Sequence, residues 1–360
     1  MPTKGPVPWE CAAHTAAKHD IYRRYLERWF PILMTGRKAY PSVTYAEGFA
    51  GPGVYCGGEV GSPVIAMKAL MDKVPSDKGI ARFLFVDDDQ RCIDMLPDQL
   101  RVAFPQRPRT DQAMPVTITL GTCAEHLESE LDALQAWDQP IFANLDSWGN
   151  APVPYRLLQR LAGNVSTEAI VTLWPQHFVR FVTDMGETAD EVFGGDPAWR
   201  DIVGMAPETK SRHILTCYRQ ALKAAGFKYL LDFELVPRSG QPLYLVFGTN
   251  HPKGVGKMKD SLWEVDRARG VGFRDPRDEQ AETLFALDEP VLGPLTRALE
   301  HKLHQCGPTR VEDLRTFALH ETVYRPEQVI RALKPLQDRG RLQPAGQLRR
   351  STIVTLGPAQ

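Results

Sequence analysis

The alternation of short apolar runs with longer amphipathic segments constrains the fold of this 360-residue chain more than any other feature. Short runs rich in β-branched residues between helical patterns are typical of β-α-β units and a mostly parallel sheet. Seven such runs are predicted strands: residues 43–46, 81–86, 116–120, 140–145, 169–173, 229–236 and 243–248. The turn Pro237-Arg-Ser-Gly240 between the last two predicts an antiparallel hairpin. We therefore expect an α/β protein with a seven-stranded sheet.

Two long segments outside the predicted strands have helical patterns. Residues 12–30 place aromatic and aliphatic side chains at helical spacing, which predicts a long helix ahead of the first strand. Residues 176–226 are mostly helical with Gly and Pro breaks, and we expect this insertion to cap a substrate cleft. The predicted organisation is an N-terminal helical segment (1–40), a main domain that contains the insertion (41–270), a linker (271–290) and a small C-terminal domain (291–360).

The C-terminal domain has the pattern of a winged helix-turn-helix. Three predicted helices precede a strand there: residues 291–303, 311–318, 326–338 and 353–356. From residue 291 onward the chain has eleven Lys and Arg against six Asp and Glu, whereas the whole chain has a net charge of −1. This local surplus favours contact with RNA or DNA phosphates. The predicted recognition helix offers only Arg331 and Lys334, which are few for sequence-specific base reading.

Composition excludes several classes of protein. No stretch approaches the ~18 apolar residues of a membrane span, and residues 1–9 lack the apolar core of a signal peptide. We therefore expect a cytoplasmic protein without membrane attachment. The six cysteines are scattered and form no C-x-x-C pair, so we expect neither a disulfide framework nor a metal site.

A glycine-rich loop, Tyr45-Ala-Glu-Gly-Phe-Ala-Gly-Pro-Gly53, directly follows the first predicted strand. Glycines allow positive φ and close approach of a ligand, and open α/β sheets bind ligands at the carboxyl ends of their strands. The next helix opens with Gly61-Ser-Pro63, where Ser62 is placed to cap it. The predicted cofactor-binding residues of this loop are Glu47, Phe49, Ala50, Gly51, Gly53 and Ser62.

Acidic residues end the second and fourth strands. The second ends in Asp87-Asp88-Asp89, and a carboxylate there can accept both hydroxyls of a ribose. Asp87 is the first candidate and Asp88 the second, although these acids could instead cap the next helix. The fourth strand and its turn read Asn144-Leu-Asp146-Ser-Trp148-Gly149.

The turn after the fourth strand suits methylation of a nucleobase nitrogen, because Asp146 can accept from an exocyclic amine while Trp148 stacks on its ring. Asp146 and Trp148 are the predicted catalytic residues, with Asn144 next. The alternative is that Trp148 packs in the core and Asp146 caps a loop. Weaker candidates for the substrate side follow the fifth and seventh strands: His177, Arg180, His251 and Lys253. A solvated loop is an equal alternative for His251 and Lys253.

Together with His14-Thr-x-x-Lys18 before the aromatic helix and Asn250-His-Pro-Lys-Gly254, these motifs resemble the three-Cys-motif partner (TcmP) family over nearly the whole chain. The resemblance implies a class I methyltransferase-like fold, S-adenosylmethionine as cofactor and a three-Cys-motif, radical-SAM-like protein as partner. The order of motifs is also similar to the large-subunit rRNA adenine-N6 methyltransferases. That similarity implies that His14 and Lys18 reach over the methionine end of the cofactor, whose cationic end Glu47 would face.

The chain departs from the family pattern at three places. Glu47 stands where the family usually has Asp, which keeps the charge. Ser147 stands where the family tends to have Pro, which leaves the rigidity of that turn and the acceptor open. The third strand ends in Thr122 and Cys123 without the Asp that many relatives use for the adenine amine, so Thr122 or a backbone carbonyl would substitute.

The predicted function is therefore an S-adenosylmethionine-dependent methyltransferase acting on a nucleobase nitrogen of a nucleic acid or nucleotide. Two alternatives stay open, since a fold does not imply activity. One is a non-catalytic partner of a three-Cys-motif protein. The other is a nucleotide-sensing regulator that binds DNA through its winged helix.

Overall fold

The computed structural model describes residues 5–106, 112–147, 149, 151–274 and 289–357. The chain forms two compact units. The first contains the chain up to Gly254 together with Phe273 and Arg274, and the second contains Val255–Gly272 and the chain from residue 289 onward. The division falls within helix α8 (Pro252–Val265). Residues 275–288 of the predicted linker lie outside the described residues, and the predicted domain boundaries stay a prediction.

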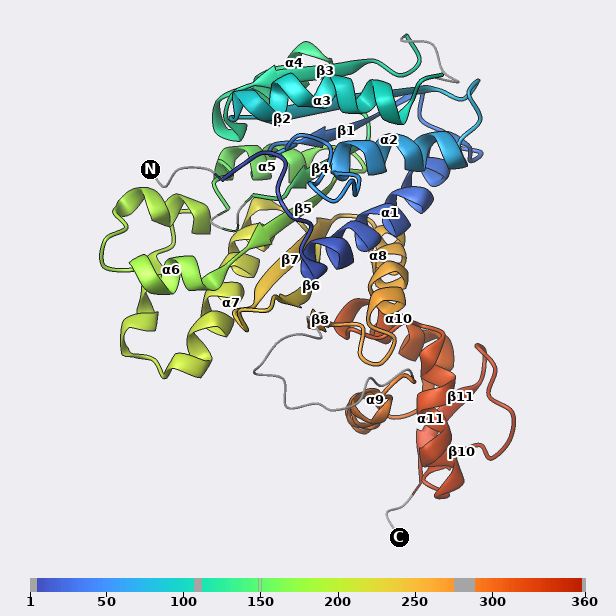
Figure 1. Ribbon diagram of the computed structural model, residues 1–360. Coiled ribbons are helices and arrows are strands. Elements are labelled where there is room, and N and C mark those ends of the chain that lie inside the picture. Colours follow the sequence, from blue (N-terminus) through green and yellow to red (C-terminus); the bar gives the residue numbers. More distant parts are fainter. Residues whose placement is uncertain (1–4, 107–111, 148, 150, 275–288, 358–360) are drawn as a thin grey trace. The chain divides into compact units, whose positions relative to one another are not determined.

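An eight-stranded sheet in the order β3-β2-β1-β4-β5-β7-β6-β8 forms the centre of the first unit (Figure 1). Its strands are β1 (Ser42–Glu47), β2 (Ile80–Asp87), β3 (Val116–Leu120), β4 (Ile141–Leu145), β5 (Glu168–Leu173), β6 (Tyr229–Val236), β7 (Leu243–Thr249) and β8 (Gly272–Arg274). Strands β1 to β5 are parallel, and β7 is antiparallel to both β5 and β6. The predicted α/β class is thus confirmed, with all seven predicted strands present; the three-residue β8 was not predicted.

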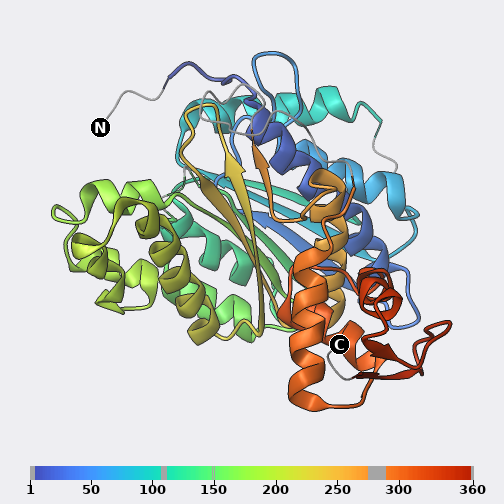
Figure 2. The same cartoon turned by 90° about the horizontal axis from the view of Figure 1, so that it is seen from below.

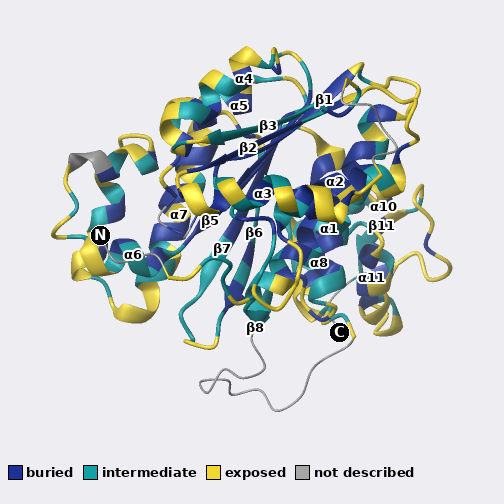
Figure 3. Ribbon diagram, turned by 45° about the horizontal axis from the view of Figure 1, so that its top comes forward, coloured by how far each residue is buried: buried dark blue, intermediate teal, exposed yellow. Residues whose placement is uncertain are grey.

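Helices cover both faces of this sheet, which is why β1, β4 and β5 are buried along their whole length (Figure 3). One face carries α1 (Ala13–Met34), α2 (Ser62–Lys73) and α3 (Gln90–Ala103). Aromatic rings fill the contact between α1 and the sheet: Tyr25 and Trp29 lie 5.6 and 5.8 Å from Phe142, centroid to centroid. The predicted N-terminal helix is therefore an integral layer of the first unit.

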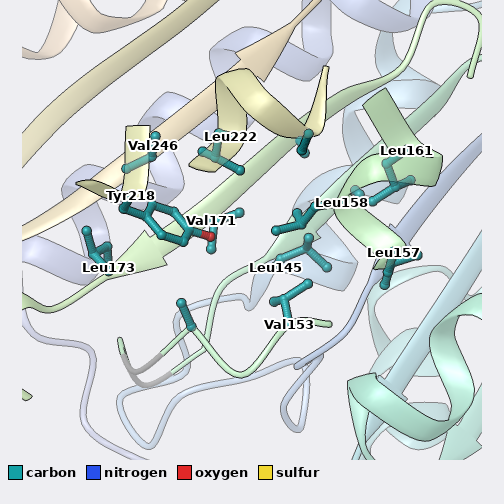
Figure 4. Close-up of a cluster of buried hydrophobic side chains, with 14 of the residues drawn as sticks. Leu145, Val153, Leu157, Leu158, Leu161, Val171, Leu173, Tyr218, Leu222 and Val246 are labelled. Atoms are coloured by element: carbon teal, nitrogen blue, oxygen red, sulfur yellow. The ribbon is translucent and has the colours of Figure 1, made fainter. Parts of the chain in front are cut away.

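The opposite face carries α4 (Glu128–Ala133), α5 (Tyr155–Gly163) and α7 (Pro207–Ala225), together with the π-helical turn η1 (Cys123–Leu127). Figure 4 shows leucines of α5 together with Tyr218 of α7 and the strand residues Val171 and Leu173 in one apolar cluster. Successive strand residues point to opposite faces. Odd-numbered residues of β5 therefore face this cluster, whereas even-numbered ones face α1, where Glu168 receives a hydrogen bond from Tyr25.

The predicted helical insertion consists of α6 (Pro175–Phe181), two 3-10 helices, η2 (Glu187–Phe193) and η3 (Pro197–Gly204), and α7. Figure 2 shows these helices gathered at one side of the sheet. Phe193 stacks on the fully buried Trp199 at 5.3 Å, and the Trp199 indole N–H donates to Asp190 Oδ1 at 2.7 Å. These aromatic side chains join the apolar cluster on the sheet face that carries α5 and α7.

Besides its part of α8, the second unit has among its described residues the helices α9 (Gly293–Cys306), α10 (Val311–Glu321) and α11 (Gln328–Asp338), and a small antiparallel sheet. The order of this sheet is β10 (Leu342–Gln343), β11 (Ile353–Leu356), β9 (Thr309–Arg310). Trp263 of α8 joins its apolar core. Lys259 of α8 is 1% exposed, and its ammonium donates to four backbone carbonyls at the end of α10: Ala318 (2.9 Å), Leu319 (2.7 Å), Thr322 (2.6 Å) and Tyr324 (3.0 Å).

None of the described helices combines the length and the apolar character that a membrane span requires. Among the same residues, no group of three or more His, Cys, Asp or Glu side chains is arranged to hold a metal ion. The six cysteines are free thiols.

Candidate cofactor and acceptor site

The acids predicted for the site meet at the carboxyl edge of the sheet. Strand β1 pairs in parallel with both β2 and β4, and Glu47 lies opposite Phe85 on one side and Asn144 on the other. Glu47 ends β1, Asp87 ends β2 and Asp146 follows β4. Parallel pairing therefore brings the three carboxyl groups to one edge, as in the crevice where open α/β sheets bind ligands.

The glycine-rich loop folds back onto the end of β2. The Ala50 N–H donates to the Val86 carbonyl at 3.0 Å, and the Gly51 N–H donates to Asp87 Oδ2 at 2.8 Å. Gly51 and Gly53 have φ of +65° and +77°, which favours glycine. A Cβ at Gly53 would also lie 2.7 Å from a methyl group of Leu96, so α3 leaves no space for a side chain there.

The three consecutive acids after β2 have different roles. Asp87 is 9% exposed, and besides Gly51 it accepts from the Asp89 N–H at 2.9 Å. Asp88 is exposed. Asp89 caps α3 by accepting from the backbone N–H of Arg91 at 3.0 Å, and it also binds the Arg91 guanidinium. The helix-capping alternative therefore applies to Asp89, whereas Asp87 ties the glycine loop to its strand.

Glu47 is a buried carboxyl group, 1% exposed, that accepts from Tyr45 Oη at 2.8 Å and Ser62 Oγ at 2.7 Å. Burial raises its pKa to about 8, the charges of Asp146 and Asp87 act in the same direction, and the two hydrogen bonds oppose the shift. The predicted capping role of Ser62 is wrong: Gly61 is the N-cap and makes no side-chain cap bond, while Ser62 begins α2 and binds Glu47.

Asn144 belongs to the same hydrogen-bonded chain. Its Nδ2 donates to Tyr45 Oη at 3.2 Å, so Asn144, Tyr45 and Glu47 are linked in sequence. Asn144 is 1% exposed, and its Oδ1 has no hydrogen-bond partner among the residues that the structure describes. Buried acceptors are nearly always satisfied, so this oxygen suits a donor from a bound molecule.

Asp146 receives three donors. Lys18 Nζ lies 2.5 Å from Oδ2, Tyr22 Oη donates to the same oxygen at 3.2 Å, and Thr172 Oγ1 donates to Oδ1. The side chains of Lys18 and Asp146 are each 13% exposed. Because a carboxylate offers about four acceptor positions, one remains for a further donor. Lys18 and Tyr22 are one helical turn apart on α1, a spacing that makes them neighbours on one face.

The turn after Asp146 is fixed by the residue that departs from the family pattern. Ser147 Oγ accepts from the backbone N–H groups of Gly149 at 3.1 Å and Ala151 at 3.2 Å. Gly149 has φ of +97°, and its carbonyl accepts from the Trp174 N–H at 2.6 Å. A Cβ at Gly149 would lie 2.4 Å from the Trp174 Cβ. Trp148 itself lies outside the described residues.

Several other predicted site residues support the loops of this edge. Thr122 caps η1 by accepting from the Glu125 N–H at 3.2 Å. Cys123 is 1% exposed, and a Cβ at Gly48 would lie 2.6 Å from its sulfur. Burial raises the pKa of the Cys123 thiol to about 12. Phe49 packs against the core on the side of α5 and α7, and His14 is half-buried in the first turn of α1.

The prediction that His251 and Lys253 lie on the substrate side of this site is wrong. Strand β7 runs antiparallel to β5, so Thr249 at its end pairs with Glu168, the first residue of β5. His251 and Lys253 therefore follow at the opposite, amino edge of the parallel strands. His177, in contrast, lies just beyond the carboxyl end of β5, 5.2 Å from the Phe181 ring.

Sequence reasoning missed the hydroxyl partners of the acids and a histidine. Tyr22 could have been found from its spacing to Lys18, but Tyr45 and Thr172 lie inside strands and meet the acids only through the sheet. His19, 8% exposed, lies 3.4 Å from Tyr55 Oη, and burial lowers its pKa to about 4, with the Lys18 charge acting in the same direction. It is therefore a buried, neutral imidazole next to Lys18 in the sequence.

Comparisons with known proteins give a limited result. No family model and no curated protein sequence matches the chain. Among solved structures, the chain is similar to EvdMO1, with 12% identity and a TM-score of 0.35 over 69% of this chain; it spans 46% of that one. It is also similar to the complex of Trm1 from Pyrococcus horikoshii with S-adenosyl-L-methionine, with 11% identity and a TM-score of 0.32 over 96% of this chain and 91% of that one. These values carry no argument about function, and membership of the TcmP family stays a prediction.

Proposed function

We propose that this protein is an S-adenosylmethionine-dependent methyltransferase whose site is the carboxyl edge of β1, β2 and β4. One observation carries the proposal: a glycine loop tied to Asp87 lies beside the buried Glu47, with Asp146 at the next strand end. The proposed acceptor is a nucleobase nitrogen of a nucleic acid or nucleotide. A carboxylate with a free acceptor position beside the cofactor loop suits an exocyclic amine.

The residues of this edge fit the cofactor. The positive-φ glycines Gly51 and Gly53 allow the loop to approach it closely, and Asp87 is the proposed ribose ligand, with Asp88 as the second candidate. Glu47, with its pKa raised to about 8, would gain a counter-charge from the cationic methionine end and ionise. The buried Asn144 Oδ1 suits a donor from the same end. Further proposed contacts come from His14, Phe49, Ala50, Thr122 and Cys123.

The bound cofactor would supply a methyl group on a positively charged sulfur. Asp146 accepts a hydrogen bond from the acceptor amine and thereby orients its nitrogen, while Thr172 and Tyr22 hold the carboxylate. Lys18 balances the charge of Asp146. The acceptor nitrogen would become more acidic on receiving the methyl group. Its hydrogen then passes to Asp146 or to water.

We propose that the second unit is a winged helix-turn-helix that binds nucleic acid mainly through phosphates. Three helices and a three-stranded antiparallel sheet support this assignment, and Arg349 and Arg350 are exposed between β10 and β11. On α11, Arg331 lies 3.4 Å from Glu289, and Lys334 lies 3.8 Å from Asp338. These acidic partners disfavour base reading by α11, and with it the alternative of a sequence-specific DNA regulator.

The test is calorimetric titration with S-adenosylmethionine and S-adenosylhomocysteine. The wild-type protein should bind both, whereas Gly51→Val and Asp87→Ala should each weaken binding at least about tenfold, because they disturb the loop and remove a charged acceptor. Asp88→Ala tests the second candidate: it removes an exposed carboxylate one residue away, and if Asp87 is the ribose ligand it should retain wild-type affinity.

Absence of binding to both ligands in the folded wild-type protein would refute the methyltransferase proposal. It would leave the non-catalytic partner of a three-Cys-motif protein as the remaining interpretation. If Asp87→Ala and Asp88→Ala change the cofactor affinity equally, the assignment of Asp87 as the ribose ligand is wrong.

A further inference from the structure

Trp174 lies directly after β5 at the same edge as Asp146. Its backbone N–H donates to the Gly149 carbonyl at 2.6 Å, and its side chain occupies the space that any residue other than glycine at position 149 would need. The indole is half-buried. The turn that carries Asp146 and the backbone that carries Trp174 are therefore held together.

Three other tryptophans satisfy both the N–H and one face of the indole within the protein. The N–H of Trp137 donates to Asp132, that of Trp199 to Asp190 and that of Trp263 to the Val323 carbonyl, at 2.7, 2.7 and 2.9 Å. An arginine guanidinium lies over each ring at 4.0, 4.5 and 5.6 Å: Arg160, Arg200 and Arg325. Each of these indoles is used for packing.

Trp174 differs from them. Within residues 5–106, 112–147, 149, 151–274 and 289–357, no hydrogen bond reaches its indole N–H, and no cation or aromatic ring lies over its face. Tryptophan usually finds a hydrogen-bond partner when it is buried. A half-buried indole that is fixed at the backbone, and that has no such ring partner among the described residues, is suited to bind something from outside the chain.

The strand geometry indicates what this indole would contact. Side chains two residues apart in extended backbone point to the same face, and the backbone of Trp174 is extended. Thr172, two residues earlier, donates to Asp146 Oδ1. The Trp174 side chain therefore lies on the same face as that of Thr172, the face of α1, just beyond the carboxyl end of β5.

We propose that Trp174 is a base-stacking residue that positions an unpaired nucleobase with its exocyclic amine toward Asp146. This inference rests on the proposed methyltransferase function and deepens it, since it specifies a single-stranded or extruded base as the acceptor. An amine inside a duplex is out of reach of such an edge, so its base must leave the stack. Arg180, exposed on α6 six residues after Trp174, provides a positive charge for the adjoining phosphates.

The test compares binding of a fluorescein-labelled single-stranded RNA 12-mer of mixed sequence by wild type, Trp174→Ala, Trp174→Leu, Trp174→Phe and Trp137→Ala. Stacking on one base contributes enough that Trp174→Ala should weaken binding roughly 5- to 150-fold. Trp174→Leu keeps apolar volume and serves as the second variant in case Trp174→Ala does not fold. Its RNA affinity should fall by a similar factor. Trp174→Phe keeps an aromatic face and should stay close to wild type. Trp137→Ala, a half-buried tryptophan at the opposite edge, should be neutral.

Calorimetric binding of S-adenosylmethionine on the same samples separates the two proposals. Loss of RNA affinity in Trp174→Leu with unchanged cofactor binding supports the stacking role. Wild-type RNA affinity in a folded Trp174→Leu variant overturns it. Cofactor binding without any affinity of the wild type for the single strand also overturns it and leaves the methyltransferase proposal standing. No cofactor binding at all refutes the proposed function itself.

Discussion

Two carboxyl groups of the first unit receive a tyrosine hydroxyl from the same helix, yet their surroundings differ. Tyr22 of α1 donates to Asp146 at the carboxyl edge, and Tyr25, three residues later, donates to Glu168 at the amino edge. Asp146 also has the Lys18 ammonium at 2.5 Å.

Glu168 has no such counter-charge among its described partners. Besides Tyr25, it accepts from Thr249 at 3.3 Å and from Trp29, all neutral donors, and burial raises its pKa to about 7. A tyrosine–acid contact therefore does not mark a reactive site by itself. The cation and the exposure of the carboxylate distinguish the edge proposed to act on a substrate from the one that holds a helix against the sheet.

Replacement of Asp146 and of Glu168 should have the most different effects, because only Asp146 is proposed to contact the substrate. Asp146→Ala should lower kcat by roughly 10²- to 10⁴-fold, because the acceptor amine loses its hydrogen-bond partner, while cofactor affinity changes only a few-fold. Glu168→Gln should leave turnover unchanged. The measurement is methyl transfer from radiolabelled cofactor to the acceptor identified by screening RNA, DNA and nucleotides. Full activity in Asp146→Ala would move the acceptor site, with Asn144 the next candidate.

Removal of the Lys18 ammonium should leave Asp146, like Glu168, with neutral donors and no counter-charge among its described partners. Lys18→Met leaves a largely buried carboxylate with hydroxyl donors only, and we expect a loss of about 3 kcal/mol in the free energy of unfolding, at the low end for such pairs because both side chains are 13% exposed. Urea denaturation measures this loss. The double variant Lys18→Met, Asp146→Asn should regain part of it; no regain would mean that Lys18 acts through other contacts.

The pH dependence of stability should show a more gradual effect. The Glu168 pKa rises from 4.5 to about 7 on folding, so the folded chain holds a proton that the unfolded chain releases. Stability should therefore fall as pH increases from about 4.5 to about 7, with at most ~1.4 kcal/mol per pH unit from Glu168, and Glu47 should add at most the same slope from about 4.5 to about 8. Glu168→Gln should reduce the slope below pH 7 to the part that Glu47 contributes. An unchanged urea midpoint between pH 5 and 7 in the wild type would contradict the assignment.

The strands and the acids at their ends were predictable because both depend on local pattern plus one geometric rule. Apolar runs predicted each strand from β1 to β7, and parallel strands share an edge, so Glu47, Asp87 and Asp146 were expected to meet. The same rule, applied with care, would have excluded His251. The predicted hairpin already made β7 antiparallel, which sends its end to the other edge.

The contacts between side chains were less predictable because they depend on register and reach. Thr172 and Asp146 come from neighbouring strands with no sequence signal that joins them. Ser62 has the right residue type for a cap, but the helix begins at Ser62 itself, and its hydroxyl is held by Glu47. The proposed role of Trp174 depends on a comparison that no sequence pattern supplies: its ring lacks the N–H and cation partners, among the described residues, that Trp137, Trp199 and Trp263 have.

The four carbonyls that accept from Lys259 determine where a fragment that contains the second unit must begin. The Lys259 ammonium donates to the carbonyls at the end of α10, although Lys259 lies more than thirty positions before Val291. Trp263 of the same helix, α8, fills part of the apolar core of the second unit. A fragment beginning at Val291 would lose both, leaving buried oxygens without this donor and an open space beside Tyr324. As an autonomous module the winged-helix candidate therefore begins inside α8, and a graft onto another protein has to carry that helix with it.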